Sequence, residues 1–282
     1  MKETKNSSSP IGVFDSGVGG LSILKRIRDQ LPRESILYLA DQIHVPYGER
    51  SLEEIRQFSK GIVQFFLNQG AKLIVVACNT ASAAALLFLR NTFPFVPFVG
   101  MEPAIKPAAE NSKTRRVGVL ATPATFQGAL YASVVERFAK DVILYQHTCP
   151  GLVNQIEAGN LDSPETRLIL EDALLSMVEE GIDTIVLGCT HYPFVIPVIK
   201  DIVGDNIRVI DPAPAVARQV QRLLTEEKLI KTENTQPRLT YHTTGFPKDF
   251  AETLHKFMFE QGTVKWLNWI NDDHELESVY YI

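Results

Sequence analysis

The chain has few cysteines and no long apolar run. Its 282 residues include Cys78, Cys149 and Cys189, a sparse and odd number that argues against a disulfide scaffold and for a reducing cytoplasm. No apolar run approaches the roughly 20 residues needed to span a membrane. Residues 1–9 are polar and lack the apolar core of a secretory signal. We therefore expect a cytoplasmic protein with no membrane partner, available thiols and a flexible tail at 1–9.

Basic charge is also scarce. The chain has 28 Lys and Arg against 33 Asp and Glu, for a net charge of −5. This balance provides no basic surface for nucleic acid, so we expect no such partner. A hydrophobic content of 45% and a charged content of 22% are typical of a soluble globular protein.

Cofactor motifs are missing as well. The glycine-rich segment 15–20 (Asp-Ser-Gly-Val-Gly-Gly) does not have the G-x-G-x-x-G spacing, and no phosphate-loop motif occurs. Its glycines are better explained by close approach of the backbone to a small ligand. No lysine stands in an obvious pyridoxal setting, and Cys–His pairs at metal spacing are absent. We expect neither a cofactor nor a metal.

Two cysteines occur in matching contexts. Residues 70–80 (Gly-Ala-Lys-Leu-Ile-Val-Val-Ala-Cys-Asn-Thr) and 181–191 (Gly-Ile-Asp-Thr-Ile-Val-Leu-Gly-Cys-Thr-His) each place a cysteine after an apolar, β-branched run. Such a run predicts a buried strand. Each cysteine therefore lies at a strand's carboxyl end, which is the edge where open α/β sheets bind ligands.

The matched cysteines belong to a longer internal repeat. Strand-like segments at 11–15, 36–41, 73–78 and 96–100 correspond to segments at 117–121, 142–147, 184–189 and 207–211, with offsets of 106 for the first two pairs and 111 for the last two. Helical segments alternate with these strands, which predicts a parallel sheet in each half. We expect an α/β fold of two similar lobes, produced by duplication, with the active site in the cleft between them.

The residues after 211 lie outside the repeat. Segments 238–244 and 263–270 are strand-like, and 248–259 is helical between them. Periodicity leaves open which lobe they join. The acidic segment 271–277 is expected to be a solvated terminus.

The two matched cysteines suggest acid/base chemistry. Paired about a pseudo-twofold axis, Cys78 and Cys189 would face one another, and each precedes a predicted helix N-terminus, which lowers a thiol pKa. Two such groups on opposite faces of one carbon can remove a proton and deliver another, inverting the stereocentre. A buried small residue is the ordinary role of a single cysteine, but the matched positions favour catalysis. Cys149 has no counterpart and is expected to be structural.

Short polar side chains accompany the thiols. Asp15 could hold an ammonium group or assist a thiol, and Asp41 is a weaker candidate of the same kind. His191 could promote a Cys189 thiolate or be an ordinary loop histidine, and Glu157 alone would be taken as a surface residue. The remaining side chains are either helix caps or an anion site for a carboxylate; they are Ser16, Asn79, Thr80, Thr122, Thr125 and Thr190.

Four motifs carry a family resemblance. They occupy residues 14–21 (Phe-Asp-Ser-Gly-Val-Gly-Gly-Leu), 45–48 (Val-Pro-Tyr-Gly), 77–82 (Ala-Cys-Asn-Thr-Ala-Ser) and 187–193 (Leu-Gly-Cys-Thr-His-Tyr-Pro). With them the chain closely resembles the glutamate racemases, cofactor-independent enzymes of bacterial cell-wall synthesis, over about residues 10–215. The resemblance implies that two thiols interconvert L- and D-glutamate, supplying D-glutamate for peptidoglycan.

The resemblance also implies roles for individual residues. Cys78 and Cys189 would be the two bases, Asp15 and His191 their helpers, and Asp41 and Glu157 more distant aids. Around Glu157 the family pattern Cys-Pro-x-x-Val-Pro-Leu-Val-Glu has Asn154-Gln155 in place of Pro-Leu. The residues implied to line the substrate site are Asp15, Ser16, Pro46, Tyr47, Gly48, Asn79, Thr80, Thr190 and His191.

The resemblance extends to domains and partners. It places residues 10–100 with 213–282 in the first lobe and 101–212 in the second. Some long members require a peptidoglycan precursor as activator, and we expect a homodimer or a monomer–dimer equilibrium.

Three alternatives stay open. An aspartate racemase would differ in pocket length. A thiol redox protein would join Cys78 and Cys189, which requires Cβ atoms roughly 3.5–4.5 Å apart. A two-lobed ligand binder would have the cleft without the paired bases.

Overall fold

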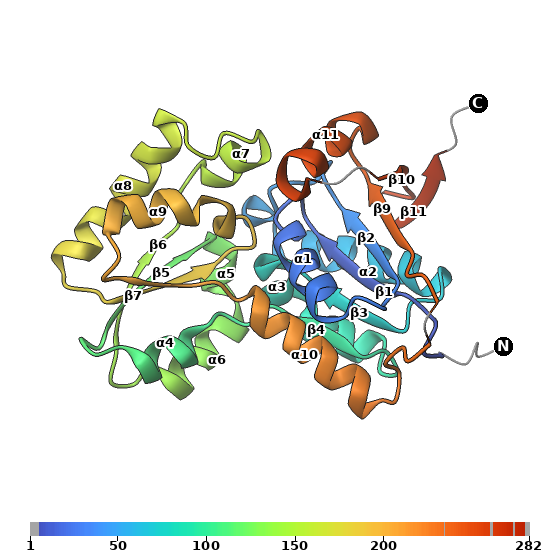
Figure 1. The fold of residues 1–282 in the computed structure, drawn as a ribbon, viewed down its shortest axis with the longest axis horizontal. Helices are drawn as coiled ribbons and strands as arrows, with labels where there is room; N and C mark the ends of the chain where they lie inside the picture. The colour runs from blue at the N-terminus through green and yellow to red at the C-terminus, as the bar shows by residue number, and fades with distance from the viewer. Residues whose placement is uncertain (1–5, 234, 260–261, 273, 280–282) are drawn as a thin grey trace.

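The chain folds into two α/β lobes, each built on its own sheet (Figure 1). The computed structural model describes residues 6–233, 235–259, 262–272 and 274–279. Within them the expected two-lobed α/β fold is confirmed.

The repeated strands have the same order in both lobes. The first sheet runs β11-β10-β9-β2-β1-β3-β4 and the second β6-β5-β7-β8. β1 pairs in parallel with β2 and β3, as β5 does with β6 and β7. The duplication is therefore visible in the topology. The repeated strands are β1 (Ile11–Asp15), β2 (Ile36–Ala40), β3 (Leu73–Val76), β4 (Phe98–Gly100), β5 (Arg116–Ala121), β6 (Ile143–His147), β7 (Thr184–Gly188) and β8 (Arg208–Ile210).

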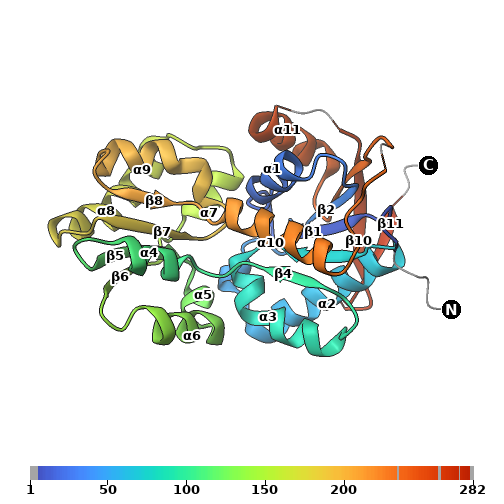
Figure 2. The same cartoon turned by 60° about the horizontal axis from the view of Figure 1, so that its bottom comes forward.

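Helices cover both faces of the first sheet (Figure 2). Alternate residues of a strand point to opposite faces: Ile11 and Val13 of β1 pack with α1 and α10, whereas Phe14 packs with α2 and α3. A Cβ at Gly12 would lie 2.8 Å from the Phe66 ring, so the strand and α2 approach closely. The helices of this lobe are α1 (Leu21–Gln30), η1 (Tyr47–Glu49), α2 (Leu52–Asn68), α3 (Asn79–Thr92), α10 (Ala213–Glu226) and α11 (Pro247–Met258).

The second sheet is covered in the same way. Val186 of β7 packs with α4 and α6, and its neighbours Ile185 and Leu187 pack with α8 and α9 on the other face. The helices of this lobe are α4 (Ile105–Asn111), α5 (Pro123–Gln127), α6 (Ala129–Phe138), α7 (Leu152–Glu157), α8 (Pro164–Glu179), η2 (Tyr192–Val195) and α9 (Ile196–Val203).

The residues after the repeat extend the first sheet. β9 (Leu239–Thr243) pairs in parallel with β2, and β10 (Val264–Ile270) pairs in parallel with β9. β11 (Glu275–Val279) then pairs antiparallel with β10. Glu275 and Glu277 are exposed, as expected for a solvated end, although this segment is a paired strand. A turn with positive φ at 271 and 272 reverses the chain, and Leu276 packs against the apolar cluster under α2.

Residues 1–5 of the predicted flexible tail lie outside the described residues. Nearby, the Ser7 carbonyl accepts a 2.5 Å hydrogen bond from the buried Lys72, which also pairs with Glu34 at 2.6 Å. The exact domain boundaries stay a prediction.

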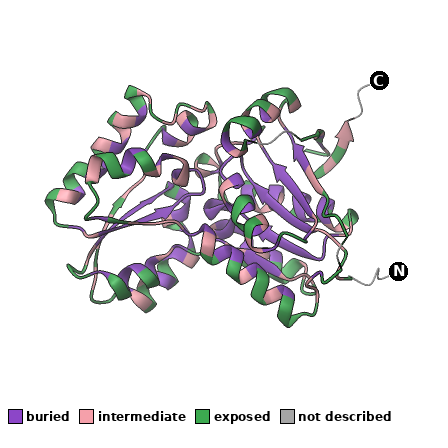
Figure 3. Ribbon diagram, in the orientation of Figure 1, coloured by how far each residue is buried: buried purple, intermediate pink, exposed green. Residues whose placement is uncertain are grey.

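Buried residues concentrate in the strands and where the lobes meet (Figure 3). No helix among the described residues is both long and apolar enough to cross a membrane.

Candidate active site between the two lobes

The two matched cysteines follow corresponding strands. Cys78 comes two residues after the end of β3, and Cys189 directly follows β7. Both are nearly buried, with 4% and 5% of their surface exposed. Each thiol therefore sits at a strand's carboxyl end, screened from water.

The Cys78 thiol is held by backbone and hydroxyl groups. Cys78 is the N-cap of α3, and its sulfur accepts a 3.4 Å hydrogen bond from the Ala81 amide. The Ser16 hydroxyl lies 3.8 Å from the same sulfur. Both partners come from the first lobe, so this half of the site is built by that lobe.

Asp15 lies at the end of β1 and is completely buried. Its carboxylate accepts hydrogen bonds from the amides of Gly17 (3.2 Å) and Gly20 (3.0 Å), and from the Thr190 hydroxyl of the second lobe (3.2 Å). Burial raises the pKa of Asp15, against the opposing charge of His191. Asp15 thus joins the two lobes at the base of the site.

The Cys189 thiol faces a histidine and a carboxylate. His191 Nδ1 lies 3.7 Å from the Cys189 sulfur, and His191 Nε2 lies 2.5 Å from Glu157 Oε1. The same Glu157 oxygen accepts a 2.8 Å hydrogen bond from the Val18 amide of the first lobe. The substitutions at 154 and 155 therefore leave Glu157 in contact with His191, and the surface role suggested by the residue alone is wrong.

His191 favours its protonated form. Burial lowers its pKa, but the hydrogen bonds to Cys189 and Glu157, together with the charges of both groups, raise the pKa well above its ordinary value. An imidazolium can donate one proton to the sulfur and the other to the carboxylate. This arrangement places a proton donor beside the Cys189 sulfur.

The glycine-rich loop serves a contact that sequence reasoning did not anticipate. A Cβ at Gly17 would overlap the Glu157 carboxylate, and a Cβ at Gly19 would lie 2.6 Å from His191 Nδ1. The bare backbone is therefore needed because side chains of the second lobe press against it, in addition to any small ligand.

The prediction of two thiols with lowered pKa is wrong for Cys78. Burial, followed by the charge of Asp15, raises its pKa strongly; the Ala81 amide and the Ser16 hydroxyl only partly oppose this, and a charge on Cys189 raises it further. Cys189, moreover, is followed by a turn and the short 3₁₀ helix η2 rather than by an α-helix. Cys78 does lie at the N-terminus of α3, but burial raises its pKa by more than the helix end lowers it.

Asn79 carries unpartnered polar atoms. Its side chain is 3% exposed, and neither its amide nitrogen nor its oxygen has a hydrogen-bond partner among the described residues. A buried polar group without a partner costs roughly 1–3 kcal/mol. A polar ligand beside Cys78 would offset that cost.

Three hydroxyls form a chain across the cleft. Thr80 of α3 lies 2.8 Å from Thr122 of the second lobe, which lies 3.0 Å from Thr125. Thr122 also caps α5. The capping interpretation is therefore confirmed for Thr122, and the anion site for a carboxylate stays a prediction.

The Tyr47 hydroxyl binds a buried carboxylate rather than a thiol. It donates a 2.6 Å hydrogen bond to Asp41, whose carboxylate also contacts His44 at 2.9 Å, Thr244 at 2.8 Å and Trp269 Nε1 at 2.7 Å. Asp41 is fully buried. It anchors the loop that carries the Val-Pro-Tyr-Gly motif, and Trp269, which supplies one of its donors, was missed because nothing in the local sequence connects β10 with residue 41.

A cavity of about 130 Å³ lies at the edge of the cleft. Pro46, Gly48 and Thr122 line it from both lobes, together with Asn154 and Cys149. Cys149 has a positive φ of 46°, which is unusual for a residue with a side chain. This turn precedes α7, which carries Glu157.

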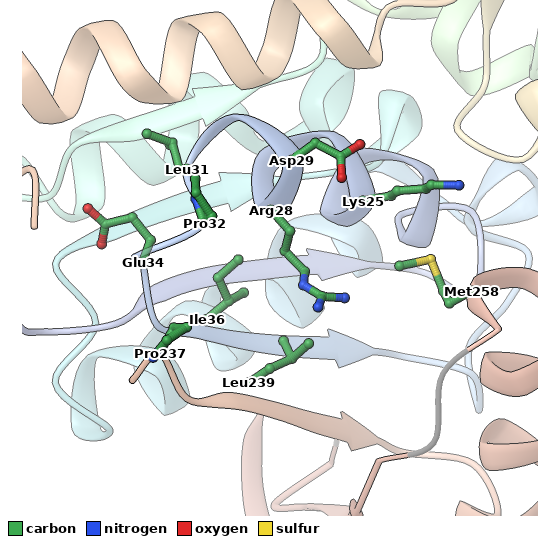
Figure 4. Close-up of a pocket in the computed structure, with 10 residues that line it drawn as sticks. All are labelled: Lys25, Arg28, Asp29, Leu31, Pro32, Glu34, Ile36, Pro237, Leu239 and Met258. Carbon is green, nitrogen blue, oxygen red and sulfur yellow. The ribbon is translucent and has the colours of Figure 1, made fainter. Parts of the chain in front are cut away.

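A second cavity lies outside the cleft. It measures about 230 Å³ and lies beside α1 at the amino ends of β2 and β9 (Figure 4). Lys25, Arg28, Ile36 and Leu239 are among its lining residues, and no predicted site residue is.

Comparison with known proteins identifies the family. The model of the Asp/Glu/Hydantoin racemase family matches residues 11–220. The chain belongs to this family. The resemblance drawn from the four motifs is confirmed, and so is the assignment of the chain as an amino-acid racemase.

Curated relatives of this racemase match over nearly their whole length. Glutamate racemase of Roseiflexus sp. (strain RS-1) is 49% identical over 89% of this chain and 92% of its own length. Glutamate racemase of Pseudomonas aeruginosa is 50% identical over 88% of this chain and 93% of its own.

Solved structures share the fold. Glutamate racemase isoform RacE1 of Bacillus anthracis matches with a TM-score of 0.86 and 33% identity, over 93% of this chain and 98% of that one. Escherichia coli glutamate racemase, solved with L-glutamate and the activator UDP-MurNAc-ala, matches with a TM-score of 0.79 and 31% identity, over 91% and 97%.

Proposed function

We propose that this racemase interconverts L- and D-glutamate through the thiols of Cys78 and Cys189. The observation that carries the proposal is that two buried thiols, at corresponding strand ends of two joined lobes, have different proton partners. Cys189 faces the His191–Glu157 pair, whereas Cys78 faces Ser16 and lies within the electrostatic influence of Asp15. One thiol is set to accept a proton while the other is set to donate one.

In the proposed reaction the Cys189 thiolate takes the α-proton and becomes a thiol. The Cys78 thiol then delivers its proton to the opposite face of the carbanion and becomes the thiolate. The stereocentre inverts, and the protein is left ready for the reverse reaction until solvent exchange restores the starting protonation. Both thiols must be aligned with the α-carbon and shielded from water. Their burial provides the shielding.

The substrate contacts follow from the unpartnered and short polar groups. Asn79 and Thr80 follow Cys78, and Thr190 follows Cys189; we propose that Asn79 and Thr80 provide donors for a carboxylate, with Thr190 beside them donating to Asp15. Asp15 already accepts three hydrogen bonds, so we propose that it acts on the charge of Cys78 rather than as the ammonium ligand. Ser16, Pro46, Gly48, Thr122 and Thr125 complete the proposed site.

The choice of glutamate rests on the relatives. Both curated relatives are glutamate racemases, and the Escherichia coli structure holds L-glutamate. We further propose that the reaction needs no cofactor, takes place in the cytoplasm and supplies D-glutamate for peptidoglycan. A homodimer or monomer–dimer equilibrium is expected, and UDP-MurNAc-ala is the activator to test because the Escherichia coli enzyme was solved with it.

Isotope incorporation tests this function directly. The protein is incubated with L-glutamate in deuterated water, and separately with L-aspartate; chirality is followed by circular dichroism and the α-carbon label by NMR. We expect D-glutamate carrying deuterium at the α-carbon and far slower turnover of aspartate. A preference for aspartate would replace the proposed substrate, and loss of thiols to a disulfide without racemisation would support the redox alternative.

A further inference from the structure

Besides the contacts at the thiols, the two lobes are joined by two chain crossings and by a contact at α11. The chain crosses between them from β4 to α4 and from β8 to α10, at the bottom of Figure 1. At the top of the same view, α11 of the first lobe faces α7 of the second. The contact at α11 therefore lies across the molecule from both covalent connections.

Two side chains of α11 make this contact. Lys256 Nζ donates a 2.6 Å hydrogen bond to the Gly159 carbonyl, and the Phe257 ring lies 4.5 Å from the Phe194 ring, tilted by 40°. Lys256 is otherwise exposed, and Phe257 is 9% exposed. Gly159 has a φ of +74°, and a Cβ there would overlap the Lys256 ammonium group. The positive φ at Gly159 favours glycine there, and Lys256 supplies the donor on the other side.

The contacted residues are close in sequence to the Cys189 half of the site. Gly159 follows Glu157 by two residues at the end of α7, and Phe194 lies in η2, three residues after His191. Glu157 in turn accepts the hydrogen bond from the Val18 amide of the first lobe. The contact therefore secures the pair that faces Cys189.

We propose that Lys256 and Phe257 are positioning residues that form a clasp between the lobes, keeping the His191–Glu157 pair in register with the first-lobe loop at 16–20. The role in catalysis rests on the proposed racemase function. The clasp must open in each cycle, because Asp15, Cys78 and Cys189 are too buried for glutamate to reach them in the closed form. Its strength then sets the balance between open and closed lobes.

Thiol alkylation measures this balance without relying on activity. The full-length protein is treated with iodoacetamide at pH 8, and the rates at Cys78 and Cys189 are followed by peptide mass spectrometry. Losing one hydrogen bond shifts such an equilibrium by about fivefold. With about one wild-type molecule in five open, Lys256→Ala should be alkylated about threefold faster at both sites. Phe257→Leu and Phe194→Leu, which test the ring contact from either lobe, should change the rates in the same direction.

Lys248→Ala is the matched control, because Lys248 is an exposed lysine of the same helix. In this variant, Cys78 and Cys189 should be alkylated at the wild-type rate. In kinetics, Lys256→Ala should raise KM for glutamate about twofold, because the closed fraction falls by about that factor, with kcat changed less than twofold. A loss of folded protein would instead lower the apparent kcat and leave KM unchanged.

Two results would overturn the clasp: alkylation and KM unchanged in Lys256→Ala, or equal acceleration in Lys248→Ala. If alkylation accelerates as expected but the wild-type protein does not racemise glutamate, the clasp stands and the proposed function fails.

Discussion

The two halves of the site stand on the same scaffold and differ in chemistry. Cys78 and Cys189 end corresponding strands in sheets of the same order. Cys78 caps an α-helix and contacts a serine, whereas Cys189 leads into a turn and contacts a protonatable histidine backed by Glu157.

This difference separates the features that the two lobes share, such as strand order, from those in which they differ, the loops after the strands. Strand order and the position of a residue after a strand depend on the core, which both halves share. The loops after the strands lie outside the two sheet cores, so their residues can differ between the lobes without changing the strand order. A repeated fold thus provides two thiols in different surroundings, and the proposed two-base reaction would use that difference.

Removing either thiol should have the largest effect. We expect Cys78→Ala and Cys189→Ala each to lower the racemisation rate by at least about 10³-fold, within the range for losing a general acid or base, while far-ultraviolet circular dichroism stays native. Full activity in either variant would show that the comparison between two catalytic halves is mistaken.

Removing the charge of Glu157 should affect the Cys189 side of the site and not the Cys78 side. Glu157→Gln keeps a hydrogen-bond acceptor for His191 but loses the negative charge that raises the His191 pKa. The imidazolium is then lost at lower pH, so the alkaline limb of kcat/KM should move to lower pH and kcat should fall about tenfold. Ser16→Ala, on the other thiol, is the contrasting variant and should leave that limb in place.

The Asp41 anchor should show a smaller, mixed effect. Trp269→Phe removes one donor to a buried carboxylate, which should lower the free energy of unfolding by about 2 kcal/mol and raise KM about twofold through the loop at 45–48. Urea denaturation and steady-state kinetics measure both. Trp266→Phe, whose ring contact with Phe246 a phenylalanine retains, is the control and should change KM very little.

The third cysteine should matter least. Cys149 has no counterpart in the first lobe, and burial raises its pKa to about 12, so it should behave as a small apolar side chain. We expect Cys149→Ala to keep racemisation within about twofold and to cost about 1 kcal/mol of stability. A loss as large as that of Cys78→Ala would mean that three thiols, and not a matched pair, serve the reaction.

The contrast between Glu157 and Trp269 shows where prediction from sequence ends. Glu157 was a candidate site residue only through the family resemblance, because its neighbours in the sequence do not distinguish it from a surface glutamate. Trp269 did not enter at all, because it lies 228 residues from Asp41 and the pairing of β10 with β9, and of β9 with β2, is what brings the two together.

The sequence by itself determined the repeat, the parallel strands and the position of each cysteine at a strand end, because local hydrophobic patterns encode these features. Only the tertiary structure decided that His191 contacts Cys189 rather than being an ordinary loop histidine, why the loop at 16–20 needs glycines, and that burial raises the Cys78 pKa. Those features depend on how two lobes, folded from distant parts of the chain, press together and exclude water, and no local pattern carries that information.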